Sequence, residues 1–410
     1  MPTLRKIKCL FTTAPKSRCE WDSGRIFGRG TGILLGEVDL NSSFDIVIVG
    51  AGPAGSCAAQ AAAQRGAKVL LIDRKQHLGI PVQCAEFVPQ WICRHASFSS
   101  TCIMQKVEKM VTHLPGRIDE MKSPGYMLDR SLFDKELAAS AVLSGAKISI
   151  ETKAVGLSPE GLIVERGSKK ETIRSKIFIG ADGATSTVAR FVGKNPLKTI
   201  AALQYEVVLS KPQNHVDVYF HKDYEGGYGW FFPKGKTANA GIGVISSKAS
   251  RLPDRLRNFL DFLTGSKKLR EIQILSKTAG LIPCEFYGKN LFKNVLLIGD
   301  AAGHAHPITG AGILNAVIAG ELAGRVAAEA IVKEDLGVLN NYDSEWQETV
   351  GKSLSYGTFK RRFLEEHWEK PGVDFEELVR KTWVGFKEYH GDRRTIPLHP
   401  PLPMGEIPPR

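Results

Sequence analysis

Residues 44–73 read FDIVIVGAGPAGSCAAQAAAQRGAKVLLID, and this stretch decides the fold. Its opening run, 44–49, is apolar and rich in β-branched side chains, which is typical of a buried parallel strand. An alanine-rich helix follows and is closed by Gly66, and the apolar run at 68–73 reads as a second strand. The pattern predicts a βαβ unit, the building block of an α/β fold.

The turn between the first strand and the helix carries the GxGxxG pattern of dinucleotide-binding proteins. Gly50 permits a tight turn, Gly52 lets the backbone approach a pyrophosphate, and Gly55 lets the helix pack on the strand. The start of the helix adds free N–H groups and a partial positive charge. Asp73 ends the second strand, where an acidic side chain accepts hydrogen bonds from an adenosine ribose and disfavours a 2′-phosphate.

Two later strands also end in glycine-rich turns, at Asp182 in KIFIGADG and at Asp300 in NVLLIGD. A dinucleotide that reaches three strand ends must be long and extended, which favours FAD over NAD. A helix of small residues is expected to begin near Gly312, with its positive end toward the flavin N1 and C2 carbonyl. Close packing of a glycine-rich helix on the sheet is the alternative explanation of this stretch.

The rest of the chain suggests how the domains are divided. Residues 128–150 repeat the order of helix, glycine stop and strand, and residues 200–250 alternate like antiparallel strands. We predict an α/β protein with a Rossmann-like FAD-binding domain and an inserted antiparallel-sheet substrate domain. The predicted parts are an N-terminal extension (1–43), the FAD-binding domain (44–200 and 277–335), the substrate domain (201–276), and a C-terminal helical region with a proline-rich tail (336–410).

Composition excludes several classes of protein. The 410 residues are 43% hydrophobic and 24% charged, and the net charge of +12 is spread along the chain, so no nucleic-acid partner is predicted. The seven cysteines have no regular spacing, which argues against a disulfide framework and favours a reducing, cytoplasmic compartment. No apolar run approaches the ~20 residues of a membrane span, which leaves at most a peripheral membrane contact. The first 43 residues lack the apolar segment of a secretory signal and are read as a dispensable extension.

Several motifs together resemble a known group of flavoproteins. The stretches GAGPAG with Asp73, YMLDRSLFDKELAASAVLSGAKI, ADGATSTVAR and GDAAGHAHPITGAGI resemble the para-hydroxybenzoate hydroxylase-type (GR2) superfamily. Within that superfamily, PVQCAEF and GGYGWFFPKG resemble the geranylgeranyl reductase family. The resemblance covers roughly residues 44–335 and implies an FAD-binding fold.

The resemblance also implies where FAD is held. Ala54 and Asp73 would hold the ADP half, Asp300 the ribityl or pyrophosphate region, and Gly312 with Ile313 the pyrimidine end of the ring. The full predicted cofactor-binding set is Gly50, Gly52, Ala54, Gly55, Asp73, Arg74, Cys84, Ala85, Phe87, Arg130, Ala154, Asp182, Asp300, Pro307, Gly310, Gly312 and Ile313.

Residues 79–87, GIPVQCAEF, contain the first candidate for catalysis. Cys84 is read in three ways: as a small buried hydrophobe, as a reactive thiol beside the flavin, or as a residue that shapes the cavity. Tyr228 and Trp230 are the other predicted catalytic residues and lie in an aromatic stretch that is otherwise typical of a sheet core. No role is predicted for Glu86.

Three further features bear on the substrate and on metals. The related reductases carry proline three residues before the tyrosine of this aromatic motif, and here the residue is Glu225, which would suit a polar or cationic group at the cavity mouth. His304 and His306 lack the spacing of metal ligands, so no metal is predicted. Residues 360–362, KRR, are interpreted as a solvated helix face rather than a lipid contact.

The leading hypothesis is an FAD-dependent oxidoreductase of geranylgeranyl reductase type, with hydride transfer from reduced flavin to a carbon–carbon double bond. The alternative is a flavin monooxygenase that hydroxylates an aromatic small molecule or protein side chain. A third hypothesis is a flavin-binding protein without turnover. The electron donor is expected to be NAD(P)H, ferredoxin or another reductant, and the substrate a small molecule that is lipidic under the leading hypothesis.

Overall fold

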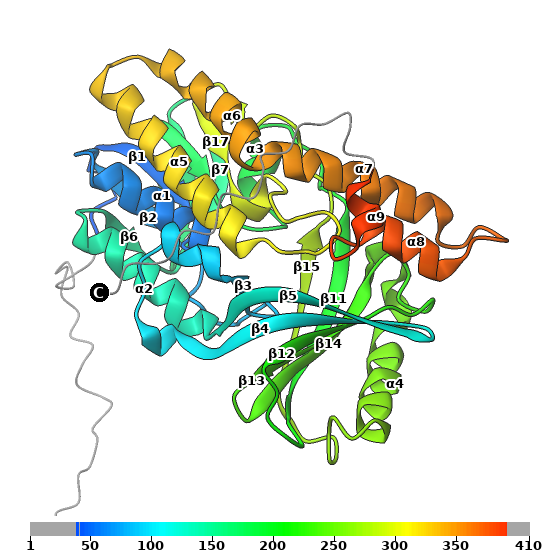
Figure 1. Ribbon diagram of the computed structural model, residues 1–410. Coiled ribbons are helices and arrows are strands. Elements are labelled where there is room, and N and C mark those ends of the chain that lie inside the picture. Colours follow the sequence, from blue (N-terminus) through cyan, green and yellow to red (C-terminus); the bar gives the residue numbers. More distant parts are fainter. Residues whose placement is uncertain (1–37, 41, 392–410) are drawn as a thin grey trace, which may run out of the picture. The chain divides into compact units, whose positions relative to one another are not determined.

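The computed structural model describes residues 38–40 and 42–391. Nearly all of the predicted N-terminal extension and the whole proline-rich tail lie outside these residues. Two large sheets organise the described part of the chain (Figure 1).

The first sheet has six strands and carries the predicted dinucleotide-binding unit. In spatial order its strands are β16 (Leu291–Phe292), β17 (Val295–Leu297), β10 (Ser175–Gly180), β1 (Phe44–Val49), β2 (Val69–Ile72) and β6 (Lys147–Ser149). All neighbours are parallel except β16 and β17. The predicted strands at 44–49, 68–73, 176–180 and 295–298 are therefore confirmed, and their carboxyl ends share one edge of the sheet.

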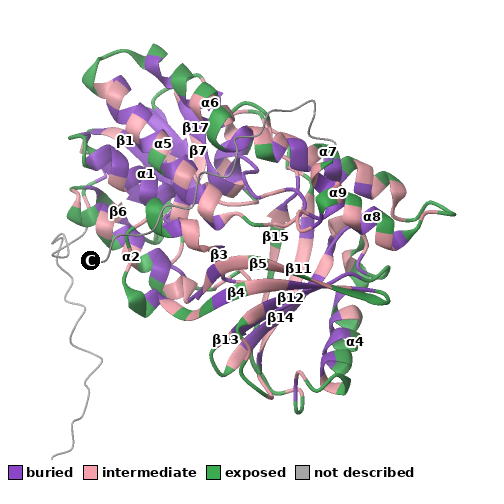
Figure 2. Ribbon diagram, in the orientation of Figure 1, coloured by how far each residue is buried: buried purple, intermediate pink, exposed green. Residues whose placement is uncertain are grey.

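Two helices of small residues, α1 (Pro53–Ala63) and α5 (Ile313–Val332), pack closely on this sheet. A third helix, α2 (Arg130–Leu143), packs against α1. Figure 1 shows α5 running alongside α1, and most of the residues at this contact are buried (Figure 2). A Cβ on Gly320 or Gly324 would overlap the backbone of α1 at Ala54 or Ala58, so glycine is what allows the two helices to lie this close.

A small sheet flanks the same unit. Its strands are β7 (Thr152–Ser158), β8 (Gly161–Arg166) and β9 (Lys169–Ile173), and α3 (Thr187–Phe191) packs on β7. The alternation in this stretch was not recognised in the sequence.

The second large sheet has eight strands and takes in more of the chain than the predicted substrate domain. In spatial order they are β15 (Ile274–Pro283), β11 (Thr199–Val208), β14 (Thr237–Ile245), β13 (Tyr228–Lys234), β12 (His215–Tyr219), β4 (Ile103–Leu114), β5 (Arg117–Leu128) and β3 (Phe87–Pro89). Only β12 and β4 pair in parallel, and that pair joins residues 103–128 to the segment 199–283.

Helices cover both faces of the eight-stranded sheet. Figure 1 shows α4 (Leu252–Gly265) on one side and the helices α7 (Lys352–His367), α8 (Phe375–Thr382) and α9 (Lys387–His390) on the other. These three helices pack on the sheet face that carries Trp230 and Phe232. The predicted C-terminal helical region is thus present, and its first helix, α6 (Asn340–Trp346), packs instead in the core of the first sheet.

The interpretation of residues 360–362 as a solvated face is wrong for two of the three. Lys360 is 2% exposed and Arg361 is 3% exposed. The Arg361 Nε donates to the Glu365 carboxylate over 2.7 Å, and its Nη1 donates to the Gly226 carbonyl. Sequence pattern alone suggested a charged surface, but tertiary packing turns both side chains inward.

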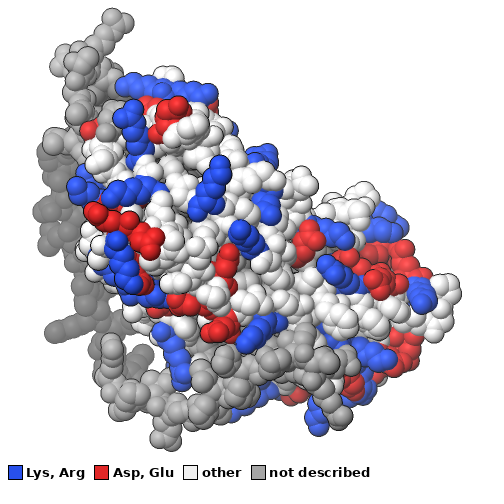
Figure 3. Space-filling view, turned by 90° about the horizontal axis from the view of Figure 1, so that it is seen from above, with Lys and Arg blue, Asp and Glu red and all other residues white. Residues whose placement is uncertain are grey.

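The surface charge is mixed. Figure 3 shows Lys and Arg side chains interspersed with Asp and Glu over the face seen from above. This face therefore carries no continuous basic stripe of the kind that nucleic-acid-binding proteins present.

Candidate active site

The glycine-rich turn has the backbone that the sequence predicted. Gly50 has φ +103°, and a Cβ there would overlap the backbone of Ala181. A Cβ on Gly55 would overlap the carbonyl oxygen of Gly50, whereas a Cβ on Gly52 would meet no atom within 4 Å. Packing thus requires the first and third glycines, and the second faces open space at the start of α1, where a pyrophosphate fits.

Asp73 lies against this turn. Its Oδ2 accepts a hydrogen bond from the Ala51 N–H over 2.8 Å, and its Oδ1 accepts one from the Lys75 N–H over 2.8 Å. Neighbouring Arg74 is exposed. The predicted contact residue Ala154 is buried in β7, a strand whose first residue, Thr152, bonds to the Asp73 carbonyl over 2.9 Å.

Asp182 uses its carboxylate within the protein. The side chain accepts hydrogen bonds from Ser186 Oγ and from the Thr187 N–H, at 2.5 and 2.6 Å, and thereby caps α3. Its part in cofactor binding stays a prediction.

Asp300 differs from the other two carboxylates. No donor in the described part of the chain bonds to its side chain, which lies 3.2 Å from the position a Cβ would take on Gly312. Burial raises the pKa of Asp300 to about 6, and Arg130 opposes that rise. A partly buried acceptor without a protein donor suits a ligand hydroxyl group, as the resemblance implies for FAD.

The turn after Asp300 ends at a helix N-terminus. α5 begins at Ile313 with Gly312 as its N-cap, and no side chain caps it, which confirms the predicted helix start. Pro307 and Gly310 (φ +67°) shape the turn that precedes it. The first N–H groups of α5 are therefore available to donate hydrogen bonds to a negatively charged ligand atom.

Two histidines, buried His304 and partly buried His306, hold the same turn in place. The His304 Nδ1 accepts from the Gly299 N–H over 3.2 Å, and its Nε2 lies 3.0 Å from Asn290 Oδ1. The His306 Nδ1 accepts from the N–H of Thr309 over 3.3 Å. Burial lowers their pKa values to about 3 and about 4, so both are neutral. Within the described residues, no group of three or more His, Cys, Asp or Glu side chains is arranged to hold a metal ion.

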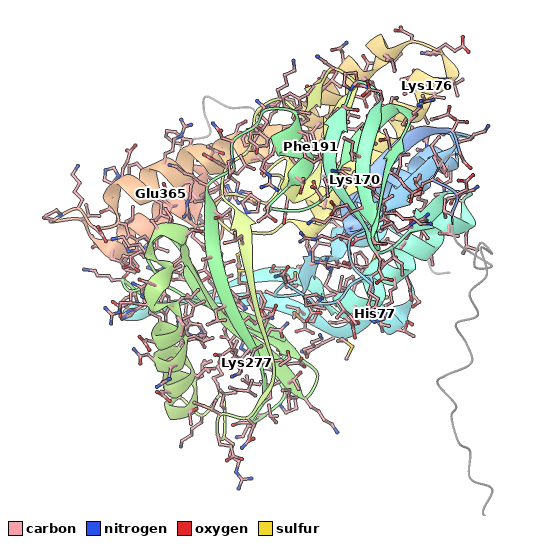
Figure 4. All side chains as sticks on the ribbon, turned by 180° about the vertical axis from the view of Figure 1, so that it is seen from behind. His77, Lys170, Lys176, Phe191, Lys277 and Glu365 are labelled. Carbon is pink, nitrogen blue, oxygen red and sulfur yellow. The ribbon has the colours of Figure 1, made fainter. Side chains whose placement is uncertain are left out.

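Residues 79–87, hereafter the 79–87 segment, are clamped onto the eight-stranded sheet. The Gln83 Nε2 donates to the Ala279 carbonyl over 2.6 Å, and Thr278 Oγ1 donates to the Val82 carbonyl over 2.7 Å. Both partners lie on β15, which Figure 4 shows from behind with Lys277 labelled on it and His77 just ahead of the segment. The segment thus bridges the end of the dinucleotide-binding unit and the second sheet.

Cys84 occupies the middle of this segment. The Gln204 Nε2 donates to its carbonyl over 3.0 Å, and the Glu86 N–H donates to its Sγ over 3.2 Å. Burial raises the pKa of the Cys84 thiol, and the positive charge of Arg130 acts in the opposite direction. The guanidinium of Arg130 is held by the Asp134 carboxylate, with N–O distances of 2.8 and 2.9 Å. At neutral pH the sulfur keeps its proton, and a cation lies close enough to stabilise the thiolate left after proton transfer.

Tyr228 and Trp230 are on β13, with their polar atoms satisfied by the protein. The Tyr228 hydroxyl donates to the Thr309 carbonyl over 2.5 Å, and the Trp230 Nε1 donates to Gln204 Oε1 over 2.8 Å. Burial also raises the pKa of Tyr228. These two residues pack in an aromatic cluster with Phe87 and Phe232. The cluster has no free polar group that could bond to a ligand.

The structure pairs the predicted acid Glu225 with a cation of the protein itself. Its carboxylate pairs with the Arg255 guanidinium of α4 at 2.6 Å, and both side chains are largely buried. The charge is neutralised within the protein, so it gives no reason to expect a cationic or polar substrate.

Sequence reasoning missed three side chains that organise the 79–87 segment. Gln204, Lys234 and Asn239 all bond to it. They belong to strands β11, β13 and β14. Lys234 falls within the quoted GGYGWFFPKG stretch, but only the pairing of distant strands reveals what the three side chains contact.

These features fit FAD as a cofactor. The three features are the open space at Gly52, the Asp300 carboxylate without a protein donor and the uncapped start of α5.

Two family models match the chain. The model described as FAD dependent oxidoreductase matches residues 45–191, and the model described as geranylgeranyl reductase catalytic domain matches residues 199–282. The first spans β1 to α3, and the second spans the strands β11 to β15 of the eight-stranded sheet.

Relatives with the same name recur among the matches. The digeranylgeranylglycerophospholipid reductase of Methanocaldococcus jannaschii is 34% identical over 346 residues, which cover 80% of this chain and 88% of the relative. Digeranylgeranylglycerophospholipid reductase 3 of Methanosphaera stadtmanae is 37% identical over 314 residues, which cover 71% of this chain and 79% of the relative.

A solved structure agrees with these matches. The geranylgeranyl bacteriochlorophyll reductase-like protein of Thermoplasma acidophilum superposes with a TM-score of 0.75 and 26% identity, over 83% of this chain and 97% of that one. A probable FAD-dependent monooxygenase of Pseudomonas aeruginosa, at 16% identity and a TM-score of 0.63, covers 79% of this chain and 97% of its own and shares the fold alone. The predicted fold class and the prediction of an FAD-dependent oxidoreductase are confirmed. The chain belongs to the geranylgeranyl reductase family of FAD-dependent oxidoreductases.

Proposed function

We propose that this enzyme reduces carbon–carbon double bonds in the isoprenoid chains of a lipid. The observation that carries the proposal is the aromatic cluster that packs against Ala85 and Phe87 of the 79–87 segment, in which Tyr228 and Trp230 direct their polar atoms to protein acceptors. A site bordered by side chains without free polar groups suits an apolar chain. The names of the relatives point to geranylgeranyl groups on a glycerophospholipid.

The chain's own part in the reaction is binding, exclusion of water and delivery of a proton. Reduced FAD, when bound, would supply the hydride for one carbon of the double bond and become oxidised, and the other carbon would take up a proton. Cys84 is the proposed proton donor, since its raised pKa keeps the thiol protonated at neutral pH. Arg130 stabilises the resulting thiolate, and solvent then restores the proton.

A groove next to the 79–87 segment is the proposed path of the isoprenoid chain. It has a volume of about 700 Å³ and an apolar part formed by Val107, Met121 and Tyr126. Tyr126 pairs with Val88, which directly follows the segment. Its rim carries Lys106 and other charged side chains, which would face the polar end of a lipid.

The electron donor is proposed to be NAD(P)H, ferredoxin or another reductant. We also propose a reducing, cytoplasmic setting, because the cysteines in the described residues are all unpaired. Across residues 38–40 and 42–391 we find no helix that combines the length and apolar character of a membrane span. Peripheral contact with a membrane that holds the lipid substrate is part of the proposal.

Anaerobic turnover tests the proposal directly. The holoenzyme is reduced chemically without oxygen and mixed with digeranylgeranylglycerophospholipid. We expect the flavin absorbance to return as the lipid gains two hydrogens for each double bond by mass spectrometry. Mixing with the fully saturated lipid is the control and should leave the flavin reduced.

Other outcomes support the alternatives. A flavin that stays reduced with the unsaturated lipid, but hydroxylates an aromatic compound once oxygen is admitted, would identify a monooxygenase. A bound flavin that no acceptor reoxidises would indicate a binding protein without turnover.

A further inference from the structure

Glu86 lies inside the 79–87 segment in an unusual conformation. The residue is 3% exposed and has φ +70°, a left-handed conformation that non-glycine residues rarely adopt. Such a conformation persists where surrounding contacts determine it. The contacts of its side chain therefore bear on how the segment is held.

The Glu86 carboxylate joins three separate elements. Its Oε1 accepts a hydrogen bond from the Arg130 N–H at the start of α2, over 2.9 Å. Its Oε2 accepts from the Lys234 Nζ at the end of β13 over 2.6 Å and from the Asn239 Nδ2 of β14 over 2.9 Å. One side chain thus ties the segment to the helix that carries Arg130 and to two strands of the eight-stranded sheet.

The same network sets the backbone around Cys84. The Glu86 N–H donates to the Cys84 Sγ over 3.2 Å, and the Asn239 Nδ2 also donates to the Ala85 carbonyl over 3.2 Å. The Leu128 N–H donates to the Glu86 carbonyl over 2.9 Å. A shift of the carboxylate would therefore move the atoms that orient the thiol.

The pairing with Lys234 is an ion pair shielded from water. The Lys234 side chain is 12% exposed and that of Glu86 is 3% exposed. Removal of either charge leaves the other one buried without its partner, so the pair acts as one unit. The ionisable groups around the carboxylate are Arg130 and Cys84 on the cofactor side and Lys234 on the sheet side.

We propose that Glu86 is a positioning residue. Its carboxylate holds the 79–87 segment against the eight-stranded sheet, so that the Cys84 thiol stays aligned with the double bond to be protonated. The inference rests on the proposed function for its catalytic consequence. The mechanical link between Glu86, Lys234 and the segment can be tested separately.

The test compares holoenzymes of the wild type and of Glu86→Gln, Lys234→Met and the double variant. Glutamine keeps the shape of the side chain and removes its charge. We expect hydrogen exchange of the backbone amides of the segment to rise at least tenfold in each single variant. The exchange rate in the double variant should not exceed that of the faster-exchanging single variant, because both single substitutions break the same ion pair.

The catalytic readout separates positioning from general damage. In anaerobic stopped-flow experiments, reoxidation of the reduced flavin by digeranylgeranylglycerophospholipid should slow at least tenfold in both single variants. Reoxidation by oxygen, which needs no proton donor at the substrate, should keep its wild-type rate. Glu225→Gln breaks another shielded ion pair of the same sheet and should change neither readout.

The proposal is overturned if the segment exchanges its amide hydrogens at the wild-type rate in Glu86→Gln and Lys234→Met. It is also overturned if flavin reoxidation slows equally with the lipid and with oxygen. If Glu86→Gln does not fold, Lys234→Met decides alone, because it leaves the bonds from Arg130 and Asn239 to Glu86 in place. If the wild type fails to react with the lipid while exchange still rises in the variants, the positioning link stands and the proposed substrate fails.

Discussion

Gly52→Ala should separate cofactor binding from folding. A Cβ at this position meets no protein atom within 4 Å, and the residue already has an extended conformation, with φ −79° and ψ −173°. Alanine adopts this conformation without strain. The added methyl group would instead fill the space at the start of α1 where the pyrophosphate is expected to bind.

The size of the effect follows from the bond that the methyl group displaces. A hydrogen bond from a backbone N–H to a charged oxygen contributes about 1.5–3 kcal/mol. Loss of one such bond predicts an FAD dissociation constant roughly 10- to 150-fold higher. The free energy of unfolding of the FAD-free protein should change by only about 1 kcal/mol, the scale of an altered N-cap.

Gly55→Ala is the matched comparison, three residues along the same turn. A Cβ there would overlap the Gly50 carbonyl oxygen, and backbone cannot rotate away as a side chain can. α1 would have to move off β1, at a cost of about 3 kcal/mol or more.

Two measurements check both variants. Flavin fluorescence during titration of the FAD-free protein gives the dissociation constant, and urea unfolding gives the stability. The reasoning is refuted if Gly52→Ala binds FAD as tightly as the wild type, or if it loses as much stability as Gly55→Ala.

Three further predictions concern the site and the buried charges. Cys84→Ser should keep its FAD but reduce the lipid about 100-fold more slowly or worse, because serine is a far weaker acid; unchanged anaerobic stopped-flow rates would leave Cys84 only a packing role. Because burial raises the pKa of Asp300 from 3.8 to about 6, the folded FAD-free protein holds this proton more tightly than the unfolded chain does. The contribution of Asp300 to the free energy of unfolding should therefore decrease as pH rises from about 4 to about 6, and Asp300→Asn should lack this contribution. Identical pH profiles of the two proteins in urea unfolding would contradict this prediction. Arg361→Met should lower the free energy of unfolding by about 3 kcal/mol, whereas a substitution at the exposed neighbour, Arg362→Met, should change it by no more than about 0.5 kcal/mol. Equal losses in urea unfolding would contradict the burial of Arg361.

The dinucleotide-binding unit was predictable because its signals are local. Strand, glycine turn and helix follow one another within residues 44–73, and the structure places β1, α1 and β2 there. Turn chemistry and hydrophobic period act over a few residues, so a short window of sequence contains them.

The second sheet was only partly predictable. The alternating strands after residue 200 are present, but β3, β4 and β5 join them from residues 87–128 through the parallel pair of β12 and β4. A local sequence pattern does not predict which distant strand will pair with an edge strand, since that pairing depends on the packing of the whole sheet.

The site shows the same division. The sequence alone was enough to predict the glycine-rich turns, the strand ends at Asp73, Asp182 and Asp300, and the FAD-dependent class. Tertiary structure alone decided that Glu86 pairs with Lys234, 148 residues away in the chain, and that Glu225 pairs with Arg255. Backbone conformation is set largely by neighbours in sequence, whereas the burial and pairing of a charge depend on which distant segments fold against it.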